Sequence, residues 1–206
     1  MLDRAAAAFS ALLVHEAGHL LAARLLRVPV KKMELFPFGG ITYVENMYRL
    51  NLVGQTFLSL AGPAVNLFLF CAGYGFLRYG FFSGKTGQFF CAANLLLASF
   101  NLLPGLPLDG GRVLVAWLAR KTGLYRANHV GARAGQVAGL LTFAGGAAGF
   151  SLQCWGLDVP AVGLLLIWAA TRELRFTPYL FARQLLVKER ELTGSKVLPG
   201  FLLVAA

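Results

Sequence analysis

One apolar segment near the N-terminus constrains this chain more than any other feature. Residues 5–23 are long enough to cross the hydrocarbon core of a membrane, which takes about 20 residues of helix. The only ionisable side chains in this segment are those of His15, Glu16 and His19. An ionisable group at the centre of a membrane costs at least about 2.5 kcal/mol, so such a residue is functional by default. The segment therefore predicts a membrane helix that carries a reactive site.

The spacing of these three residues is that of a metal site. In a helix, His15 and His19 lie on one face because they are four positions apart. Two imidazole rings placed in this way can bind one Zn²⁺ ion, and Glu16 can act as a base toward water at the metal. A chance match on a solvated helix face is the alternative interpretation. The apolar surroundings argue against it, because this segment has no solvated face.

The composition of the whole chain also indicates a membrane protein. Of its 206 residues, 57% are hydrophobic and only 14% are charged, which is unusual for a soluble domain. The net charge of +10 raises the alternative of nucleic-acid binding. However, the basic residues lie between apolar segments and in the C-terminal tail, where contacts with anionic lipids are expected. We therefore expect a lipid bilayer as the surroundings and no nucleic-acid partner.

Hydropathy predicts about five membrane-spanning helices. They cover residues 5–23, 56–77, 88–119, 134–152 and 159–171. Lys and Arg are frequent in the connections after the first and third segments and in the C-terminal tail, and they are scarce or absent in the other connections. By the positive-inside rule, this alternation places the C-terminus in the cytoplasm.

The connection after the first predicted span is more than a plain loop. Residues 33–46 read MELFPFGGITYVEN, with β-forming residues on both sides of Pro37 and a Gly-Gly pair. This pattern predicts a small membrane-associated β-hairpin, and a short amphipathic connector on the membrane surface is the open alternative. The expected fold class is therefore an all-α polytopic membrane protein of about five spans, with this hairpin after the first span.

A second unusual sequence interrupts the third apolar segment. Residues 101–112 read NLLPGLPLDGGR, and Pro104 and Pro107 lack the N–H groups that a continuous helix needs. Non-helical backbone at membrane depth is tolerated where it is buried in protein or lines a cavity. Asp109 lies in this break, and two histidines with one carboxylate complete the three protein ligands of a catalytic zinc. The alternative role for Asp109 is that of a helix N-cap.

Together, these motifs resemble those of the site-2 protease family of intramembrane zinc metalloproteases. The motifs are HEAGH at residues 15–19, LFPFGG at 35–40, AGP at 61–63 followed by Asn66, and NLLPGLPLDGG from Asn101 onward. Their spacing is most similar to that of the branch that contains the stage IV sporulation protein FB.

The resemblance implies a zinc-dependent endopeptidase with assigned roles for the matching residues. The implied zinc ligands are His15, His19 and Asp109. Glu16 is then the general base, and afterwards the proton donor to the leaving amine. Asn66 and Asn101 are candidate contacts to the substrate or to the oxyanion. Hydrogen bonding between membrane helices is an equally open role for both asparagines.

The resemblance also implies partners and a domain organisation. The substrate would be a membrane-associated protein, which in the sporulation branch is a sigma-factor precursor, and a regulatory membrane subunit that inhibits the site is a further expected partner. We expect a multi-pass bacterial membrane protein with a metalloprotease domain at 1–172 and a basic cytoplasmic tail at 173–206, without a CBS domain. The alternative function is that of a membrane metal transporter or metal-sensing protein with the same His and Asp ligands.

Overall fold

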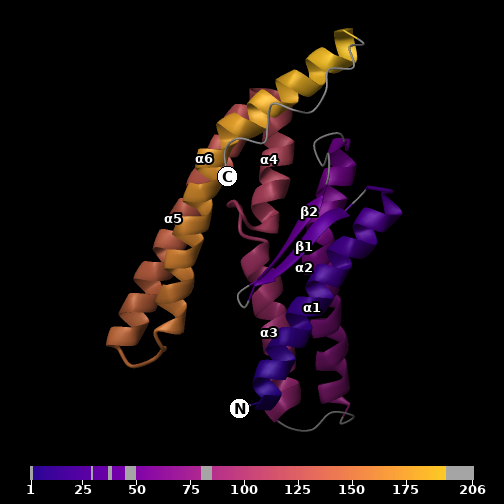
Figure 1. Cartoon of the computed structure of the whole chain (residues 1–206). Helices are drawn as coiled ribbons and strands as arrows, with labels where there is room; N and C mark the ends of the chain where they lie inside the picture. Colours follow the sequence, from indigo (N-terminus) through magenta and orange to yellow (C-terminus); the bar gives the residue numbers. More distant parts are fainter. Residues whose placement is uncertain (1, 29, 37–38, 45–49, 80–84, 194–206) are drawn as a thin grey trace.

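The computed structural model describes residues 2–28, 30–36, 39–44, 50–79 and 85–193. These residues form six helices and two short strands. In chain order they are α1 (Leu2–Leu25), β1 (Val30–Phe36), β2 (Gly39–Val44), α2 (Leu52–Arg78), α3 (Lys85–Asn101), α4 (Asp109–Thr122), α5 (Leu124–Ser151) and α6 (Asp158–Thr193). Figure 1 shows α1, α2 and α3 side by side, with α4 next to them and the long α5–α6 pair on the far side of α4.

Helices α1 and α2 approach each other closely because small residues lie between them. Part of this contact is a core cluster formed by Ala22, Ala23 and Leu58. A Cβ atom on Gly18 would lie only 2.9 Å from the carbonyl oxygen of Ala61, so no larger residue fits at position 18. This close backbone contact brings the histidine-bearing face of α1 directly against α2.

The helical backbone is interrupted between α3 and α4, as the two prolines predict. The N–H of Leu106 donates to the carbonyl of Gly131 on α5 at 2.9 Å, which ties the interruption to the neighbouring helix. A Cβ atom on Gly110 would lie 2.2 Å from the carbonyl oxygen of Leu102, so the start of α4 folds tightly against the end of α3. The first residue of α4 is Asp109, which this backbone contact holds in a fixed position.

The prediction of about five membrane spans is wrong. Among the described residues, only Arg4–Leu25 of α1 and Leu52–Arg78 of α2 are long and apolar enough to cross a membrane. The predicted third span is divided into α3 with 17 residues and α4 with 14 residues. Both are shorter than the roughly 20 residues that a crossing needs. The predicted spans at 134–152 and 159–171 overlap α5 and α6, which are long enough to cross a membrane but are not apolar enough to be candidate spans.

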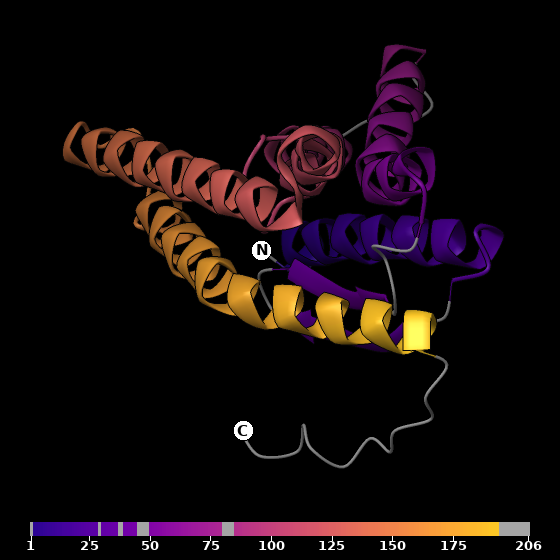
Figure 2. The same ribbon diagram turned by 90° about the horizontal axis from the view of Figure 1, so that it is seen from above.

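Strands β1 and β2 pair in an antiparallel two-stranded sheet. Lys32 is opposite Tyr43, and the register shifts between Val30 and Lys32. Seen from above in Figure 2, the strands run alongside α1, and β2 is in contact with that helix. Two parts of the predicted hairpin segment, residues 37–38 and 45–46, lie outside the described residues.

Helix α6 runs without interruption to Thr193, through the boundary that the sequence suggests between residues 172 and 173. It packs along α5, and the connection between the two helices is short. The predicted division into a protease domain and a basic tail therefore falls inside one helix, and it stays a prediction.

Candidate metal centre

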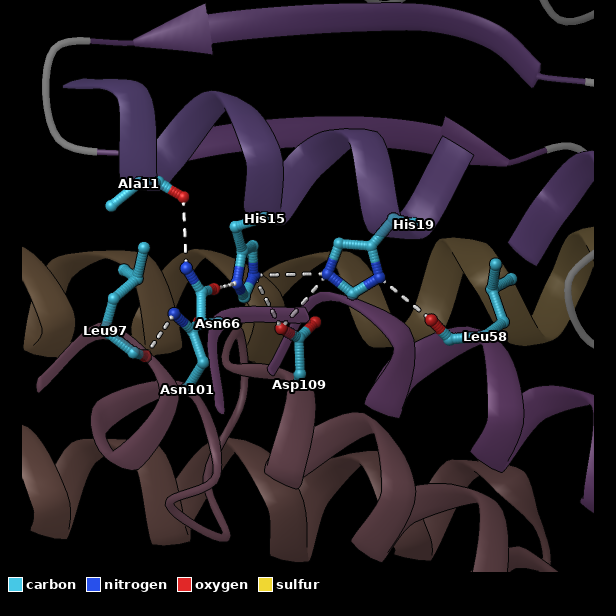
Figure 3. A network of polar contacts seen from close by, with 8 residues as sticks. All are labelled: Ala11, His15, His19, Leu58, Asn66, Leu97, Asn101 and Asp109. Atoms are coloured by element: carbon cyan, nitrogen blue, oxygen red, sulfur yellow. Dashed lines mark hydrogen bonds and ion pairs between the residues drawn. The ribbon is translucent and has the colours of Figure 1, made fainter. Parts of the chain in front are cut away.

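Three buried side chains from two helices converge at the centre of the α1–α4 group. His15 and His19 lie one turn apart on the same face of α1, and Asp109 begins α4. Figure 3 shows both imidazole rings and the carboxylate pointing toward one another. One ligand atom from each residue lies within 4.8 Å of the others, and this is the group in the described part of the chain that could hold a metal ion.

The distances within this group fit a tetrahedral metal site. Nε2 of His15 lies 3.2 Å from Oδ2 of Asp109, and Nε2 of His19 lies 3.3 Å from the same oxygen. The two Nε2 atoms are 3.2 Å apart. A tetrahedral zinc ion with bonds of about 2.0–2.1 Å holds its ligand atoms roughly 3.3–3.4 Å apart. The three atoms therefore already form one face of a zinc coordination tetrahedron.

The hydrogen bonds on the outer side of each ring determine what faces the centre. Nδ1 of His15 lies 2.5 Å from Oδ1 of Asn66, and Nδ1 of His19 lies 2.8 Å from the carbonyl oxygen of Leu58. Both partners are acceptors, so both Nδ1 atoms carry the proton and donate. The two neutral Nε2 atoms then direct lone pairs at each other and at the carboxylate. Such a convergence needs a positive charge between the three atoms, and a divalent cation supplies it to all of them at once.

Gly62 on α2 leaves the space that a metal ion would need. A Cβ atom at this position would lie 2.4 Å from Nε2 of His19 and 2.7 Å from Nε2 of His15. Any side chain at position 62 would therefore occupy the volume next to both coordinating atoms. The donor set and this open volume together fit a zinc ion with one position left for water.

The other predicted site residues lie at different distances from this centre. Glu16 is buried beside His15 on α1, with 4% of its surface exposed. Asn66 contacts the outer side of His15 rather than the converging atoms. Asn101 is drawn near the group in Figure 3, and its amide donates to the carbonyl of Leu97 in its own helix at 3.0 Å. The structure thus brings the two histidines and Asp109 together and places Asn101 outside that cluster.

Sequence reasoning gave no functional role to two positions that contribute to this centre. Asn94 is fully buried on α3 and accepts a hydrogen bond from Asn66. A polar residue in an apolar helix usually faces the interior of the bundle, and this signal could have drawn attention to Asn94. The carbonyl of Leu58 could not have been found in this way, because a backbone acceptor has no sequence signature.

Comparison with known proteins shows what the chain is similar to. Residues 5–86 match the peptidase family M50. The chain is 38% identical over 149 residues to Rip3 of Mycobacterium tuberculosis, named a candidate zinc metalloprotease, with 68% of this chain and 37% of Rip3 covered. It is 28% identical over 173 residues to a zinc metalloprotease of Methanocaldococcus jannaschii, with 81% of this chain and 48% of that protein covered. This chain thus spans less than half the length of these two relatives.

A solved structure supports the same assignment. The site-2 protease from Methanocaldococcus jannaschii superimposes with a TM-score of 0.66 at 26% identity, over 82% of this chain and 76% of that one. Residues 5–86 thus match peptidase family M50, and the fold is similar to that of a site-2 protease, as the motifs suggest. These similarities and the two apolar helices indicate a membrane protein.

The narrower assignment to the sporulation branch stays a prediction. The stage IV sporulation protein FB of Bacillus subtilis is 29% identical over 198 residues, with 91% of this chain and 65% of that protein covered. This chain shares a lower sequence identity with the sporulation protein than with Rip3, although the region aligned with the sporulation protein is longer.

Proposed function

We propose that this chain is the catalytic part of an intramembrane zinc metalloprotease that hydrolyses a peptide bond of a membrane-associated protein. The observation that carries the proposal is the convergence of two imidazole nitrogens and one carboxylate oxygen within 3.3 Å of one another. Relatives that are named zinc metalloproteases support both the metal and the reaction class.

In this proposal His15, His19 and Asp109 hold the zinc ion. A zinc ion bound there supplies a Lewis acid that acidifies water and polarises a carbonyl group. The two outer hydrogen bonds keep the rings in one orientation, so the ligand atoms need little rearrangement when the metal binds. Burial of all three side chains excludes competing water and strengthens their electrostatic interactions.

Glu16 is the proposed general base. It follows His15 directly on α1 and is buried, so its carboxylate belongs to the same protected environment as the ligands. It takes a proton from the attacking water, whose oxygen bonds to the scissile carbonyl carbon. It then gives this proton to the amine nitrogen as the C–N bond breaks. The carboxylate is thereby regenerated and the proton count balances.

Asn101 is the proposed polar contact to the substrate or to the developing oxyanion. Its Nδ2 atom carries two hydrogens, and the bond to the Leu97 carbonyl uses one of them. The residue lies where α3 ends, next to the interruption that precedes Asp109. A donor at the edge of an irregular segment can reach an extended peptide without disturbing a helix.

For the membrane arrangement we propose that the basic half of α6 lies on the cytoplasmic side. Lys and Arg recur along the chain from Arg172 to Arg190, and positive charge favours the cytoplasmic face. A reporter fused after Glu191 should therefore be active in the cytoplasm and inactive when it requires export. Export of this reporter would reverse the proposed orientation.

The protease proposal is tested by co-expression with a sporulation sigma-factor precursor, the substrate that the resemblance to the sporulation branch suggests. We expect a shortened product with the unaltered chain and none with Glu16→Gln. A metal transporter could retain function in this variant, since the three ligands remain. Cleavage at the unaltered rate by Glu16→Gln would overturn the proposed mechanism.

A further inference from the structure

We propose that Asn66 and Asn94 are positioning residues that determine which ring nitrogen of His15 faces the metal. The inference rests on the proposed zinc site. His15 lies on α1, Asn66 on α2 and Asn94 on α3, and the side chains of both asparagines are fully buried. Three helices are thus connected by one chain of hydrogen bonds that ends at a metal ligand.

The direction of this chain is set by two backbone carbonyl groups, which can only accept. Nδ2 of Asn94 donates to the carbonyl of Phe90 at 2.9 Å, and this turns Oδ1 of Asn94 toward α2. That oxygen accepts from Nδ2 of Asn66 at 2.7 Å. Nδ2 of Asn66 also donates to the carbonyl of Ala11 at 3.1 Å. Both hydrogens of the Asn66 amide nitrogen are therefore used, and its oxygen is left to face His15.

This arrangement matters because an amide group can be turned over with almost no change in shape. A reversed Asn66 would present its nitrogen to Nδ1 of His15, and Nδ1 would then have to accept. The ring proton would move to Nε2, the atom that faces Asp109 and the metal position. A protonated Nε2 cannot bind a metal ion. With Asn94 in place, a reversed Asn66 would also direct its oxygen at two acceptors, which disfavours the reversal.

The other histidine of the site shows why His15 needs this support. Nδ1 of His19 donates directly to the carbonyl of Leu58, a backbone acceptor that cannot be turned over. His15 instead depends on a side-chain amide, and that amide depends on a second one. Neutral amides achieve this without a further negative charge at membrane depth, where a carboxylate would be costly. We therefore expect removal of the Asn94 side chain to lower the zinc affinity only through its effect on the His15 ring.

The test measures zinc affinity of the full chain in mild detergent by competition with a chelator. We expect Asn66→Leu to weaken zinc binding by about 10–100-fold and Asn94→Leu by about tenfold, the range for residues that support a metal ligand. The double variant should be no weaker than Asn66→Leu alone, because both act through the same ring. Asn128→Leu removes a buried asparagine on α5 and is the matched control, expected to bind zinc as the unaltered chain does.

A conservative variant and a spectroscopic readout separate this role from a purely structural one. Asn94→Asp, whose protonated carboxyl group offers one donor and one acceptor, should restore affinity to within about threefold of the unaltered chain. In the zinc-free protein, ¹⁵N NMR of the three histidines should show His15 with its proton on Nδ1, and Asn94→Leu should shift part of the population to Nε2.

The outcomes distinguish this inference from the proposed function. If the unaltered chain binds no zinc, the zinc site itself is wrong. If it binds zinc and Asn94→Leu leaves both the affinity and the His15 spectrum unchanged, the positioning role is overturned. If Asn94→Leu does not fold, the NMR measurement is made on Asn94→Asp instead. Loss of the Nδ1 proton signal of His15 in this folded variant would contradict the proposal.

Discussion

The α1–α4 group and the α5–α6 pair both expose large apolar side chains, but their interiors differ. The α1–α4 group buries most of the polar side chains that the described residues place inside the protein, namely His15, Glu16, Ser59, Asn66, Asn94 and Asp109. In the α5–α6 pair, glycines bring two backbones into contact. Buried hydrogen bonds and charge therefore distinguish the first region, whereas close backbone contact is the main feature of the second, where Gln136 also donates to Thr171 across the pair at 2.9 Å.

The contacts between α5 and α6 show how shape acts there. A Cβ atom on Gly139 would lie 2.9 Å from the backbone nitrogen of Ile167. A Cβ atom on Gly163 would lie 2.4 Å from the backbone nitrogen of Phe143. Close backbone approach at small residues is a common way to hold apolar helices together when water is absent. Substitutions in this pair should affect stability alone, whereas substitutions around the buried polar side chains of the α1–α4 group should affect chemistry.

The largest expected effect comes from Glu16, the proposed base. Glu16→Gln should lower the cleavage rate by about 10³-fold, within the range for loss of a general base. Zinc content should stay the same because the three ligands are unchanged. Cleavage of a co-expressed substrate and metal analysis measure the two quantities. The control variant Glu173→Gln removes a carboxylate from α6 and should leave the cleavage rate and the zinc content unchanged. An equal loss of cleavage in Glu16→Gln and Glu173→Gln would contradict the difference between the two regions.

The next effect is expected at Gly62, where a methyl group would lie 2.4 Å from Nε2 of His19. Gly62→Ala should weaken zinc binding by about tenfold or more, because the methyl group competes with the metal for the same space. Gly75→Ala is a control in the same helix, since a Cβ atom there would have no neighbour within 4 Å. Chelator competition measures both variants. Equal zinc affinity of Gly62→Ala and Gly75→Ala would show that the metal lies elsewhere.

The smallest effect is expected from the α5–α6 contact. Gly139→Ala should destabilise the protein by about 1–3 kcal/mol through overpacking, which lowers Tm by roughly 2–10 °C. Zinc content should not change, because α5 and α6 supply none of the proposed ligands. Gly145→Ala on the same helix has open space around its Cβ position and should leave Tm as it is. Loss of zinc in Gly139→Ala without a change in Tm would contradict the division between the two regions.

The sequence predicts the ligand set because the chemistry is local or marked by helix breakers. His15 and His19 share a helical face by their spacing alone, and Asp109 follows two prolines that end the helix before it. The role of Asn94 could not be predicted, because no motif or helix breaker marks this residue and its partner lies on another helix. The number of spans was overestimated for a related reason. For the third predicted span, hydropathy does not register where the backbone leaves the helix, as it does after Asn101. The fourth and fifth predicted spans lie in α5 and α6, which are continuous but not apolar enough to be candidate spans.

Metal analysis of the purified chain tests the central claim most directly. The account predicts about one zinc ion per chain in mild detergent, held by His15, His19 and Asp109. A variant with His15→Ala and Asp109→Ala should lose this zinc while it remains folded, because two of the three ligands are removed. Absence of zinc from the unaltered protein, or undiminished zinc in the double variant, would contradict the account.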